Sequence, residues 1–563
     1  MSAELTDALQ MYPWPMNLST NADPMQIRPT SVQQNINTVY KGTRDNPGGV
    51  GTRPGLDRQA LSATIQIGLD SGTAPDILFA VDYWANVSSA KQARFVAVTA
   101  DFRVFADNYS GAWATELTGS AVTLDSYGEG EITSSVMNED LILGLKDSTD
   151  SIVVWEAQDT STLRPLSSTT GFSGVISGAF FQGIARCWLT QQHQSRLFYA
   201  GDPQNPDRLY FSKAFFYNQF DVTGTNPAGF LDVFPGDGDS NGVTAIFPSL
   251  NSQELYIAKR RKLYKIITSD PNPNLWGIVR VSGEIGCVNH NTAKTLDQRD
   301  IFFESDLGVH SLLQVIAGTE ILDGTLASYS ITRDFREVIQ GSSKGAHSAV
   351  YDPERNLYIL TAKSSNASNF DLIYVFDNET KAWSTWETSA AVQFNYITTR
   401  FDKETGRTRL YVCSNDGWMN EFCEKYKDDL STNSINTQIR SALLFPQQTF
   451  LKETNFTDCY VLARATGTTD VSITYRIDSQ QSQTVTGSII ALGGNTLGTT
   501  VLGPMFVLGI ARGVRPIPFK LAGVGYTIEI TLTQNELGKN IEFYGLIIKF
   551  QNSSETRTQQ GNY

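Results

Sequence analysis

The residues of this chain that could do chemistry are few, and the most suggestive of them form an acidic loop. Asp237-Gly-Asp-Ser-Asn-Gly242 places oxygen ligands at its first, third and fifth positions and glycine at its sixth, as calcium-binding loops do. Pro248 stands where such a loop carries its closing glutamate, and no flanking helix is apparent. Asp237, Asp239 and Asn241 are therefore candidate calcium ligands, although a tight Asx turn between two strands explains the same residues.

Other residue types with catalytic potential lack the spacing that their chemistry requires. The chain has four histidines, His193, His290, His310 and His347. They form no HExxH or HxH pair, so no zinc site is expected. Acidic pairs such as Glu129 with Glu131 and Asp428 with Asp429 could serve glycoside hydrolysis, but solvated loops commonly carry such pairs. Because no phosphate-binding GxxxxGK[S/T] loop is present and the serines in turns show no recognisable partner, we expect no catalytic residues, no cofactor and no enzyme activity.

One basic cluster stands out in an otherwise acidic chain. It comprises Lys259, Arg260, Arg261 and Lys262. The cluster falls in a predicted turn between Tyr256 and Tyr264. It could contact DNA phosphates or an acidic neighbouring subunit, or it could simply be solvated.

Composition and charge favour a β-rich protein of several domains. The chain has 563 residues, of which 40% are hydrophobic and 18% charged, with 30 Phe, 22 Tyr and 45 Gly. This length suggests roughly two to four domains, and the aromatic and turn-forming residues favour β structure. The net charge is −14 and the pI is near 4.9. Bulk charge would therefore not attract nucleic acid, whereas an acidic wall would let DNA pass without binding.

The chain shows no sign of a secretory or membrane segment. Its first ten residues, MSAELTDALQ, have neither a basic region nor an apolar core, and no run of about 18 apolar residues occurs. The cysteines are Cys187, Cys287, Cys413, Cys423 and Cys459. Their odd number and the lack of CxxC spacing predict reduced core residues of a protein made in a cytoplasm.

Turn-forming residues divide the chain into four segments. Residues 1–58 are rich in proline and predict an extended N-terminal arm that orders by lying on another surface. Residues 59–430 contain short apolar strands, in groups that recur at about 45–60 residues, and predict an all-β, irregular β-propeller of about six blades. Residues 431–550 alternate polar and apolar side chains and predict a C-terminal β-sandwich domain. Residues 551–563 predict a flexible polar tail.

A hairpin near the middle of the chain exemplifies the predicted blades. Its strands are expected at Arg196–Ala200 and Arg208–Ser212, on either side of a turn that contains two prolines. A dense aromatic run, Phe215-Phe-Tyr217 and then Phe220, follows the second strand. We expect similar hairpins, supported by aromatic side chains, along the whole of residues 59–430. Further strands are expected at Ala185–Leu189, Leu263–Ile267, Asp300–Glu304 and Leu357–Ala362.

This hairpin and its aromatic run resemble the central hairpin of the β-propeller tail proteins of short-tailed bacteriophages, the nozzle or DNA-stabilisation proteins. Further phrases typical of that family follow in family order: Thr52–Leu56 with its RPGL, Gly236–Ile246, Leu255–Ala258, Leu263–Ile266, Gly286–Asn289, Asp300–His310, and Val375–Asp377 with Trp383. The resemblance covers about residues 32–430. Gln34 departs from it, because family members often carry a cysteine at that place.

The resemblance implies a structural protein of the virion tail, assembled in the cytoplasm of the bacterial host. Members form a homohexameric tube below the portal and adaptor rings and contact tail fibres or spikes. The tube retains the packaged genome and conducts double-stranded DNA, without sequence specificity, during ejection. The alternative is a receptor- or polysaccharide-binding tail protein that could also degrade its ligand. A bacterial surface propeller is a third possibility, which the lack of a signal peptide disfavours.

Overall fold

The computed structural model describes residues 75–489 and 515–552, with gaps of at most eight residues, and five short strands between residues 7 and 58. The chain divides into two compact units. One comprises Met1–Leu56, Glu379–Ser389 and Cys423–Tyr563, and the other comprises Asp57–Asn378 and Ala390–Phe422. From their architecture, described below, they are called the sandwich unit and the propeller unit.

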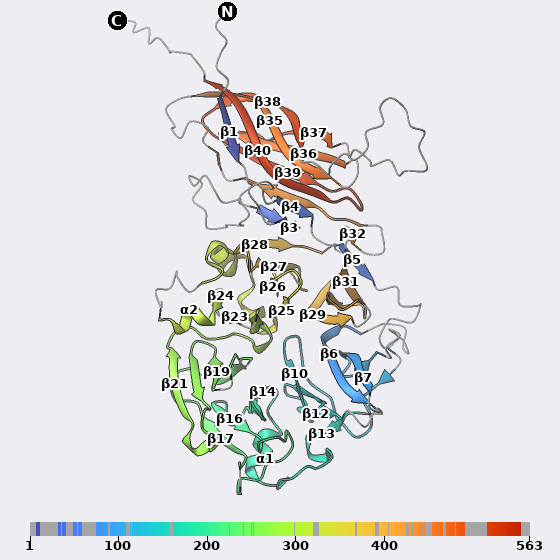
Figure 1. The fold of residues 1–563 in the computed structure, drawn as a ribbon, viewed down its shortest axis with the longest axis vertical. Helices are drawn as coiled ribbons and strands as arrows, with labels where there is room; N and C mark the ends of the chain where they lie inside the picture. The colour runs from blue at the N-terminus through green and yellow to red at the C-terminus, as the bar shows by residue number, and fades with distance from the viewer. Residues whose placement is uncertain are drawn as a thin grey trace, which may run out of the picture. The chain divides into compact units, whose positions relative to one another are not determined.

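Four sheets of four antiparallel strands follow one another along the first part of the propeller unit (Figure 1). They are β6–β9 (Ile77–Val87, Ala90–Thr99, Val104–Ala106 and Thr115–Glu116), β10–β13 (Ile132–Met137, Asp140–Leu145, Ile152–Trp155 and Arg164–Pro165), β14–β17 (Leu189–His193, Arg196–Ala200, Arg208–Phe211 and Gly229–Asp232) and β18–β21 (Val243–Ile246, Glu254–Lys259, Leu263–Ile267 and Gly277–Ser282). In every sheet each strand pairs with the next one along the chain, so each sheet is a series of hairpins.

Three further sheets complete the propeller unit. They contain β22–β24 (Lys294–Leu296, Asp300–Glu304 and Val309–Ser311), β25–β27 (Ser348–Asp352, Leu357–Ala362 and Leu372–Asp377) and β29–β31 (Phe394–Asp402, Arg407–Ser414 and Met419–Cys423). The first strand of each sheet contacts the first strand of the next, except that β18 reaches the fifth sheet through the short helix η5 (His290–Thr292). Contact between β29 and β6 closes the ring. The predicted irregular propeller is confirmed, and its described residues form seven sheets where the sequence predicted about six blades.

Short helical turns connect the sheets. They are η3 (Leu166–Ser168), α1 (Ala179–Ile184), η4 (Pro273–Leu275), η5, α2 (Leu312–Ile316), η6 (Tyr329–Ile331), the π-helical turn η7 (Asp334–Val338) and η8 (Gly341–Ala346). Within the described residues, none of these helices has the length and hydropathy needed to span a bilayer.

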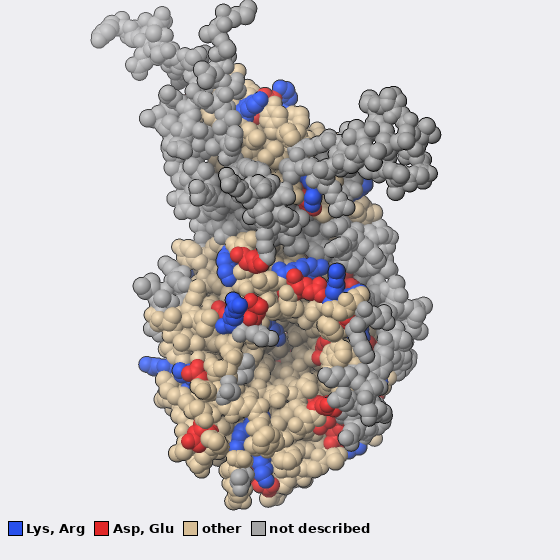
Figure 2. Space-filling model, viewed as in Figure 1, with Lys and Arg blue, Asp and Glu red and all other residues tan. Residues whose placement is uncertain are grey.

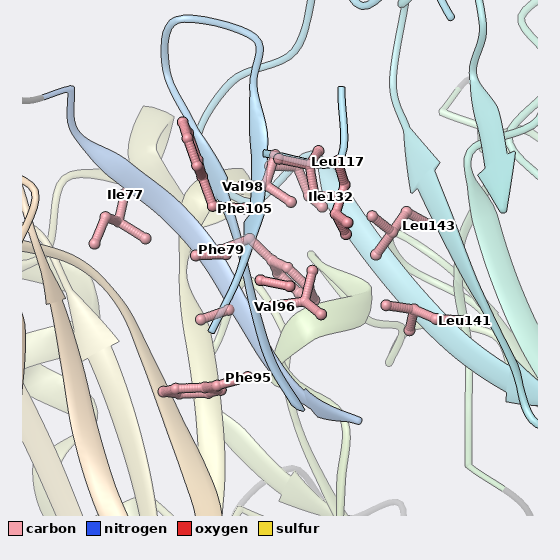
Figure 3. Packing of buried hydrophobic residues seen from close by; sticks show 14 of the residues in the cluster. Ile77, Phe79, Phe95, Val96, Val98, Phe105, Leu117, Ile132, Leu141 and Leu143 are labelled. Carbon is pink, nitrogen blue, oxygen red and sulfur yellow. The ribbon is translucent and has the colours of Figure 1, made fainter. Parts of the chain in front are cut away.

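Apolar layers between neighbouring sheets hold the ring together. Figure 3 shows one such layer, in which Phe79 and Val96 of the first sheet face Leu141 and Leu143 of the second. Central strands such as β15 and β26 are buried along their whole length, because both of their faces are covered by neighbouring sheets. The outermost strands are less buried. In β21, most residues are exposed or half-buried. This gradient explains why the central strands are continuous apolar runs in the sequence.

The sandwich unit consists of two sheets that enclose a second core. One sheet has the order β3 (Ile36–Tyr40), β4 (Gly49–Thr52), β40 (Ile541–Asn552), β35 (Thr454–Ala465) and β38 (Arg515–Gly525), with β1 (Asp7–Met11) also paired to β40. The other contains β28 (Ala382–Trp386), β2 (Val32–Gln34), β34 (Thr437–Arg440), β39 (Ile528–Gln534), β36 (Thr469–Ile477) and β37 (Gln483–Ile489). Remaining short strands are β5 (Gly55–Arg58), β32 (Lys427–Asp428) and β33 (Asn433–Ser434). Phe456, Val461, Ile473, Ile530 and Leu546 contribute to the core of this unit.

The N-terminal segment is an integral part of the sandwich unit. Strand β1 runs antiparallel to β40, and β2 lies between β34 and β28. The pairing of β28 with β2 also brings residues 379–389 into this unit, from the middle of the sequence that builds the propeller. Three distant parts of the chain therefore build one sandwich.

Candidate functional site

A cavity of about 460 Å³ opens where the first strands of several sheets begin, and we call it the mouth cavity. Loops from successive sheets line it, including Glu129, Trp188, Asp202, Arg260 and Asn289. In a closed ring of sheets, the loops at the starts of the inner strands converge on the axis. The mouth cavity is therefore an axial opening of the propeller unit and a candidate site.

Charged side chains around the mouth cavity neutralise one another in pairs. Lys146 Nζ lies 2.5 Å from Glu131 Oε1, and Lys363 Nζ lies 3.3 Å from Glu129 Oε2. Basic and acidic side chains also lie next to each other on the face of the propeller unit in Figure 2. Because both members of the predicted acidic pair Glu129 and Glu131 are held by lysines, they are not arranged as an acid and a nucleophile for glycoside hydrolysis.

The deepest of these pairs joins Arg186 to Asp202. Two guanidinium nitrogens of Arg186 donate to the two carboxylate oxygens of Asp202 at 2.8 and 3.1 Å, and Asp202 also accepts bonds from Asn205 and Tyr210. Burial opposes the ionisation of Asp202, but these donors outweigh it and hold its pKa below the usual value. The pair fixes the turn between β15 and β16, which is the turn of the central hairpin.

Behind the mouth cavity, the residues Asn289, His290 and Asn291 form a plug on the axis. Asn289 Nδ2 donates to the carbonyl of Gly130 at 3.2 Å and also to the carbonyl of Gly345, while Asn291 Nδ2 donates to the carbonyl of Ile132 at 2.9 Å. The plug precedes the fifth sheet, whereas Gly130 and Ile132 belong to the start of the second. These sheets are not neighbours in the ring, so the bonds between them cross its axis.

The plug fits its surroundings tightly. Gly130 has φ +74°, and a Cβ added there would lie 2.6 Å from Ala346 Cα and from the carbonyl oxygen of Gly345. Such distances leave no room for a larger residue, and the positive φ itself favours glycine. The axis is therefore closed between the loops of the second, fifth and sixth sheets.

A second cavity, of about 440 Å³, lies on the other side of the plug and includes His290, Asn291 and Lys294 in its lining. Burial lowers the pKa of Lys294 to about 8, and no carboxylate of the described residues forms an ion pair with it. Burial, together with the nearby charge of Lys294, lowers the pKa of His290 to about 3. His290 is thus neutral, and its Nδ1 accepts a bond from the backbone of Ile246 at 3.4 Å.

The predicted basic cluster lies at the turn between β19 and β20, and its four members differ in exposure. Lys259 is fully buried, with Nζ 2.7 Å from Asp207 and 3.2 Å from Asp237. Arg260 binds Asp306 through two bonds of 2.8 and 3.0 Å, whereas Arg261 is 75% exposed. The cluster is thus not a continuous basic patch, and Lys259 has no free charge to offer a phosphate.

Lys262 and the three candidate calcium ligands belong to the same network. Lys262 Nζ donates to the backbone carbonyl of Asp237, and the Asp237 carboxylate accepts from Tyr264 and from the backbone of Asp239. Burial opposes the ionisation of Asp237, but these donors and Lys259 outweigh it and lower its pKa. Asp239 accepts bonds from the backbones of Asn241 and Arg261. The carboxylates of Asp237 and Asp239 are therefore engaged in Asx-type turns, hydrogen bonds and ion pairs.

The remaining candidates from the sequence fall at scattered places. His193 bonds to Thr268, and His310 to Ser305. No group of three or more metal-binding side chains comes together in the described part of the chain. Asp428 lies in β32, where side chains are not described, and Asp429 lies outside the described residues.

The four described cysteines are buried and unpaired, as predicted. They are Cys187, Cys287, Cys413 and Cys459. Burial raises the pKa of Cys287 to about 12, so its thiol is not a nucleophile at neutral pH. The side chain of Cys423 lies outside the described residues.

The plug and a serine-centred group beside the mouth cavity are the features that sequence reasoning missed. The Asn289–Asn291 segment has no motif, because its role comes from bonds to residues about 160 positions away. The serine group does have a sequence signal, since Gly341-Ser-Ser-Lys-Gly345 matches the G-x-S-x-G pattern of serine hydrolases. That pattern stands in the turn η8 and lacks the strand–turn–helix setting that usually confirms it.

No protein-family model and no curated protein matches the chain. Among solved structures, BBS1N in complex with ARL6DN is 12% identical, with a TM-score of 0.35, and the match covers 69% of this chain and 98% of that one. An exo-β-1,3-galactanase from Phanerochaete chrysosporium is 10% identical, with a TM-score of 0.24 and coverage of 86% and 100%. Hsv2 of Kluyveromyces lactis is 11% identical, with a TM-score of 0.27 and coverage of 53% and 82%. Likenesses of this size bear on neither function nor partners, and the all-β propeller architecture follows from the sheets of this chain.

Proposed function

We propose that the chain is a structural subunit of a phage tail nozzle. Six copies would form a channel that retains the packaged genome and conducts double-stranded DNA during ejection. The portal or adaptor ring would bind one end, and fibres or spikes would bind the side. The observation that carries the proposal is the series of nozzle-like sequence phrases, most of which fall in order along the propeller unit.

These sequence phrases coincide with particular hairpins and connections of the fold. The phrase at Arg196–Ser212 forms the β15–β16 hairpin, and Gly236–Ile246 leads into β18. The phrase Gly286–Asn289 leads directly into the axial plug, and Asp300–His310 forms the β23–β24 hairpin. The resemblance therefore involves turns and connections of the ring, in addition to apolar strands that any propeller needs.

The closed axis determines where DNA would run in such an assembly. Asn289 and Asn291 bridge the second and fifth sheets, so a duplex has no route through a single propeller. The channel would have to lie between copies, as the proposed hexamer requires. Under this proposal a single copy could not conduct DNA, and several copies would be required.

Exposed apolar side chains on the third sheet and its flanking loops supply a surface for contact between copies. Seven of them are 40–71% exposed: Val175, Ile176, Phe215, Phe216, Val222, Phe230 and Phe234. The bridge between Ser173 and Gln219 holds the two loops that carry several of them side by side. Exposed groups of this kind commonly mark protein interfaces. In the proposed nozzle, this surface would pack against the next copy.

The charge distribution supports passage of a polyanion without binding. Residues 431–550 contain nine Lys and Arg against seven Asp and Glu, so the negative excess of the chain lies before residue 431. The basic cluster there is largely neutralised, because Lys259 and Arg260 are held by carboxylates. A channel lined by such a surface would offer few cations to the phosphates.

The alternative of a receptor- or polysaccharide-binding tail protein requires exposed aromatic platforms. Trp383 and Trp386 are among the largest fully buried side chains, and Trp113, Trp155 and Trp276 are also buried. Trp188 is the tryptophan that lines the mouth cavity. The five buried tryptophans therefore offer no exposed platform for a sugar ring. A capsule-degradation assay would discriminate, since activity that is lost on mutating one carboxylate pair would support it.

Crosslinking of intact virions, followed by denaturing electrophoresis, tests the proposal. The chain is expected to give a ladder of bands that ends at six times its mass of 62.0 kDa. Particles assembled without the chain are expected to lose their genome to added nuclease. Absence of the chain from purified virions, or a ladder that stops at one copy, would contradict the proposal.

A further inference from the structure

Three side chains beside the mouth cavity form a connected Ser–His–Glu group. Ser343 Oγ lies 3.3 Å from His347 Nε2, and His347 Nδ1 lies 3.0 Å from both carboxylate oxygens of Glu304. Ser343 belongs to η8, His347 follows that turn directly, and Glu304 ends β23 of the preceding sheet. The group is therefore assembled from two sheets.

Burial fixes the orientation of the histidine. The side chains of His347 and Glu304 are both 0% exposed. Because an ionised carboxylate can only accept, it selects the His347 tautomer that carries its proton on Nδ1. The lone pair of Nε2 then faces Ser343, as it must if the histidine is to act as a base toward the serine hydroxyl.

Ser343 is half-buried, and its hydroxyl has two acceptors within reach. In addition to His347 Nε2, Ser343 Oγ lies 2.8 Å from the carbonyl oxygen of Gln340. Rotation about the Cβ–Oγ bond redirects the proton from Gln340 to His347 without moving any heavy atom. The hydroxyl can therefore donate to the Gln340 carbonyl in the free protein and to His347 when a substrate binds.

The group lies beside a cavity that is lined by the neighbours of Ser343 in the chain. Ser342, Gly345 and Ala346, which flank Ser343 in the chain, line the mouth cavity of about 460 Å³. Much of the remaining lining is polar or charged, including Glu129, Arg260 and Asn289. A compact acyl group on a polar alcohol suits a cavity of this size and polarity.

We propose that Ser343, His347 and Glu304 form a hydrolytic site for small O-acyl esters of polar alcohols. Ser343 Oγ forms a bond to the ester carbonyl carbon while its proton passes to His347 Nε2, and the carbonyl electron pair moves to oxygen. When that pair returns, the carbon–alkoxy bond breaks and the alcohol leaves with the proton from His347. Water then attacks the acyl-Ser343 by the same steps, releasing the carboxylic acid and restoring the serine. Glu304 accepts from His347 Nδ1 and positions the imidazole.

This activity is independent of the proposed tail role, because the site is complete within one chain. The full-length chain would be treated with a fluorophosphonate probe, digested and mapped by mass spectrometry. One phosphonyl group is expected per chain, on Ser343, together with hydrolysis of p-nitrophenyl acetate above the buffer rate. Ser343→Ala should abolish both, and His347→Gln and Glu304→Gln should slow labelling by roughly a hundredfold or more.

Ser120→Ala provides the matched control, because it removes an exposed hydroxyl that lies outside the lining of the mouth cavity and leaves the group intact. This variant should react with the fluorophosphonate probe and hydrolyse p-nitrophenyl acetate as fast as the unmodified chain does. Ser343→Cys and Ser342→Cys give a second comparison that does not depend on altering buried residues. The thiol introduced by Ser343→Cys should react with iodoacetamide at pH 7 at least tenfold faster than the thiol introduced by Ser342→Cys, because His347 activates it. Labelling on another serine, hydrolysis that survives Ser343→Ala, or equal alkylation of the two cysteine variants would each overturn the proposal.

Discussion

The side-chain amide of Asn291 donates to the backbone carbonyl of Ile132 at 2.9 Å, and this bond joins the fifth sheet of the ring to the second. Both partners are buried, at 3% and 1% exposure. The bond crosses the axis and helps to close the centre of the propeller. The location of any channel, between copies instead of through one propeller, follows from this relationship.

Replacing Asn291 by alanine should destabilise the propeller unit. The substitution leaves the Ile132 carbonyl buried without its donor, which costs about 1–3 kcal/mol of unfolding free energy. Urea unfolding followed by tryptophan fluorescence measures this loss. Asn274→Ala, at an exposed position in η4, is the control and should change stability by less than about 0.5 kcal/mol. Equal effects of the two substitutions would show that the plug bond contributes nothing.

Two neighbouring cations of the basic cluster should behave in opposite ways. Lys259→Met leaves Asp207 and Asp237 without their buried partner and should cost about 3–5 kcal/mol. Arg261→Ala removes a side chain that is 75% exposed, and should cost no more than about 0.5 kcal/mol. Chemical denaturation of both variants under the same conditions gives the comparison. A small loss for Lys259→Met would contradict its structural role.

Phe215 has an unfavourable backbone conformation and an exposed ring. Its replacement should therefore affect the stability of the fold and the association between copies differently. Its φ is +71° and it is 66% exposed. Phe215→Gly relieves strain of about 1–2 kcal/mol and adds an unfolded-state entropy cost of about 0.5–1 kcal/mol, so stability should be unchanged or slightly higher.

Association between copies should nevertheless weaken at least tenfold in Phe215→Gly, as measured by sedimentation over a range of concentrations. Phe215→Tyr keeps the ring and should retain the association. If Phe215→Gly assembles as tightly as the unmodified chain, this surface is not part of the interface.

Much of the propeller was predictable from local sequence, because its central strands are continuous apolar runs. The strands Arg196–Ala200, Leu263–Ile267, Asp300–Glu304 and Leu357–Ala362 have the predicted bounds. In contrast, the Ala185–Leu189 strand prediction was wrong. There the chain leaves α1 and turns, and β14 begins only at Leu189.

The strands that could not be predicted are those that lack an apolar pattern. Strand β10, Ile132–Met137, contains Thr and two Ser because it faces the axis, and β21 is largely exposed at the rim. The make-up of the sandwich unit was also hidden, because the pairing of β1 with β40 links residues more than 500 positions apart. Ion pairs such as Lys259 with Asp207 depend on similar long-range contacts, so a basic run in the sequence did not reveal which of its charges were neutralised.

Two buried histidines should make stability fall as the pH drops below neutrality. Burial lowers the pKa of His193 to about 4, and burial with the charge of Lys294 lowers that of His290 to about 3. In the unfolded chain both titrate near 6.5. Below that pH the unfolded state binds protons that the folded state does not, so stability is full above pH 6.5 and decreases toward pH 4 by roughly 1.4 kcal/mol per histidine and pH unit.

Unfolding free energies measured between pH 7.5 and 5 test this dependence. The double variant His193→Gln with His290→Gln removes both titrating groups and should show a shallower slope over this range, whatever its stability at pH 7.5. The same slope in both proteins would rule out the histidines as its source.

A symmetry-averaged electron-microscopy reconstruction of isolated tails most directly tests the central claim that DNA runs between copies of the chain. The layer of the reconstruction that contains this chain is the one to inspect. We expect six propellers around a hole wide enough for a duplex, with each propeller closed at its own centre and DNA density between the copies. A layer without a central hole, or DNA density that passes through the axis of a single propeller, would contradict it.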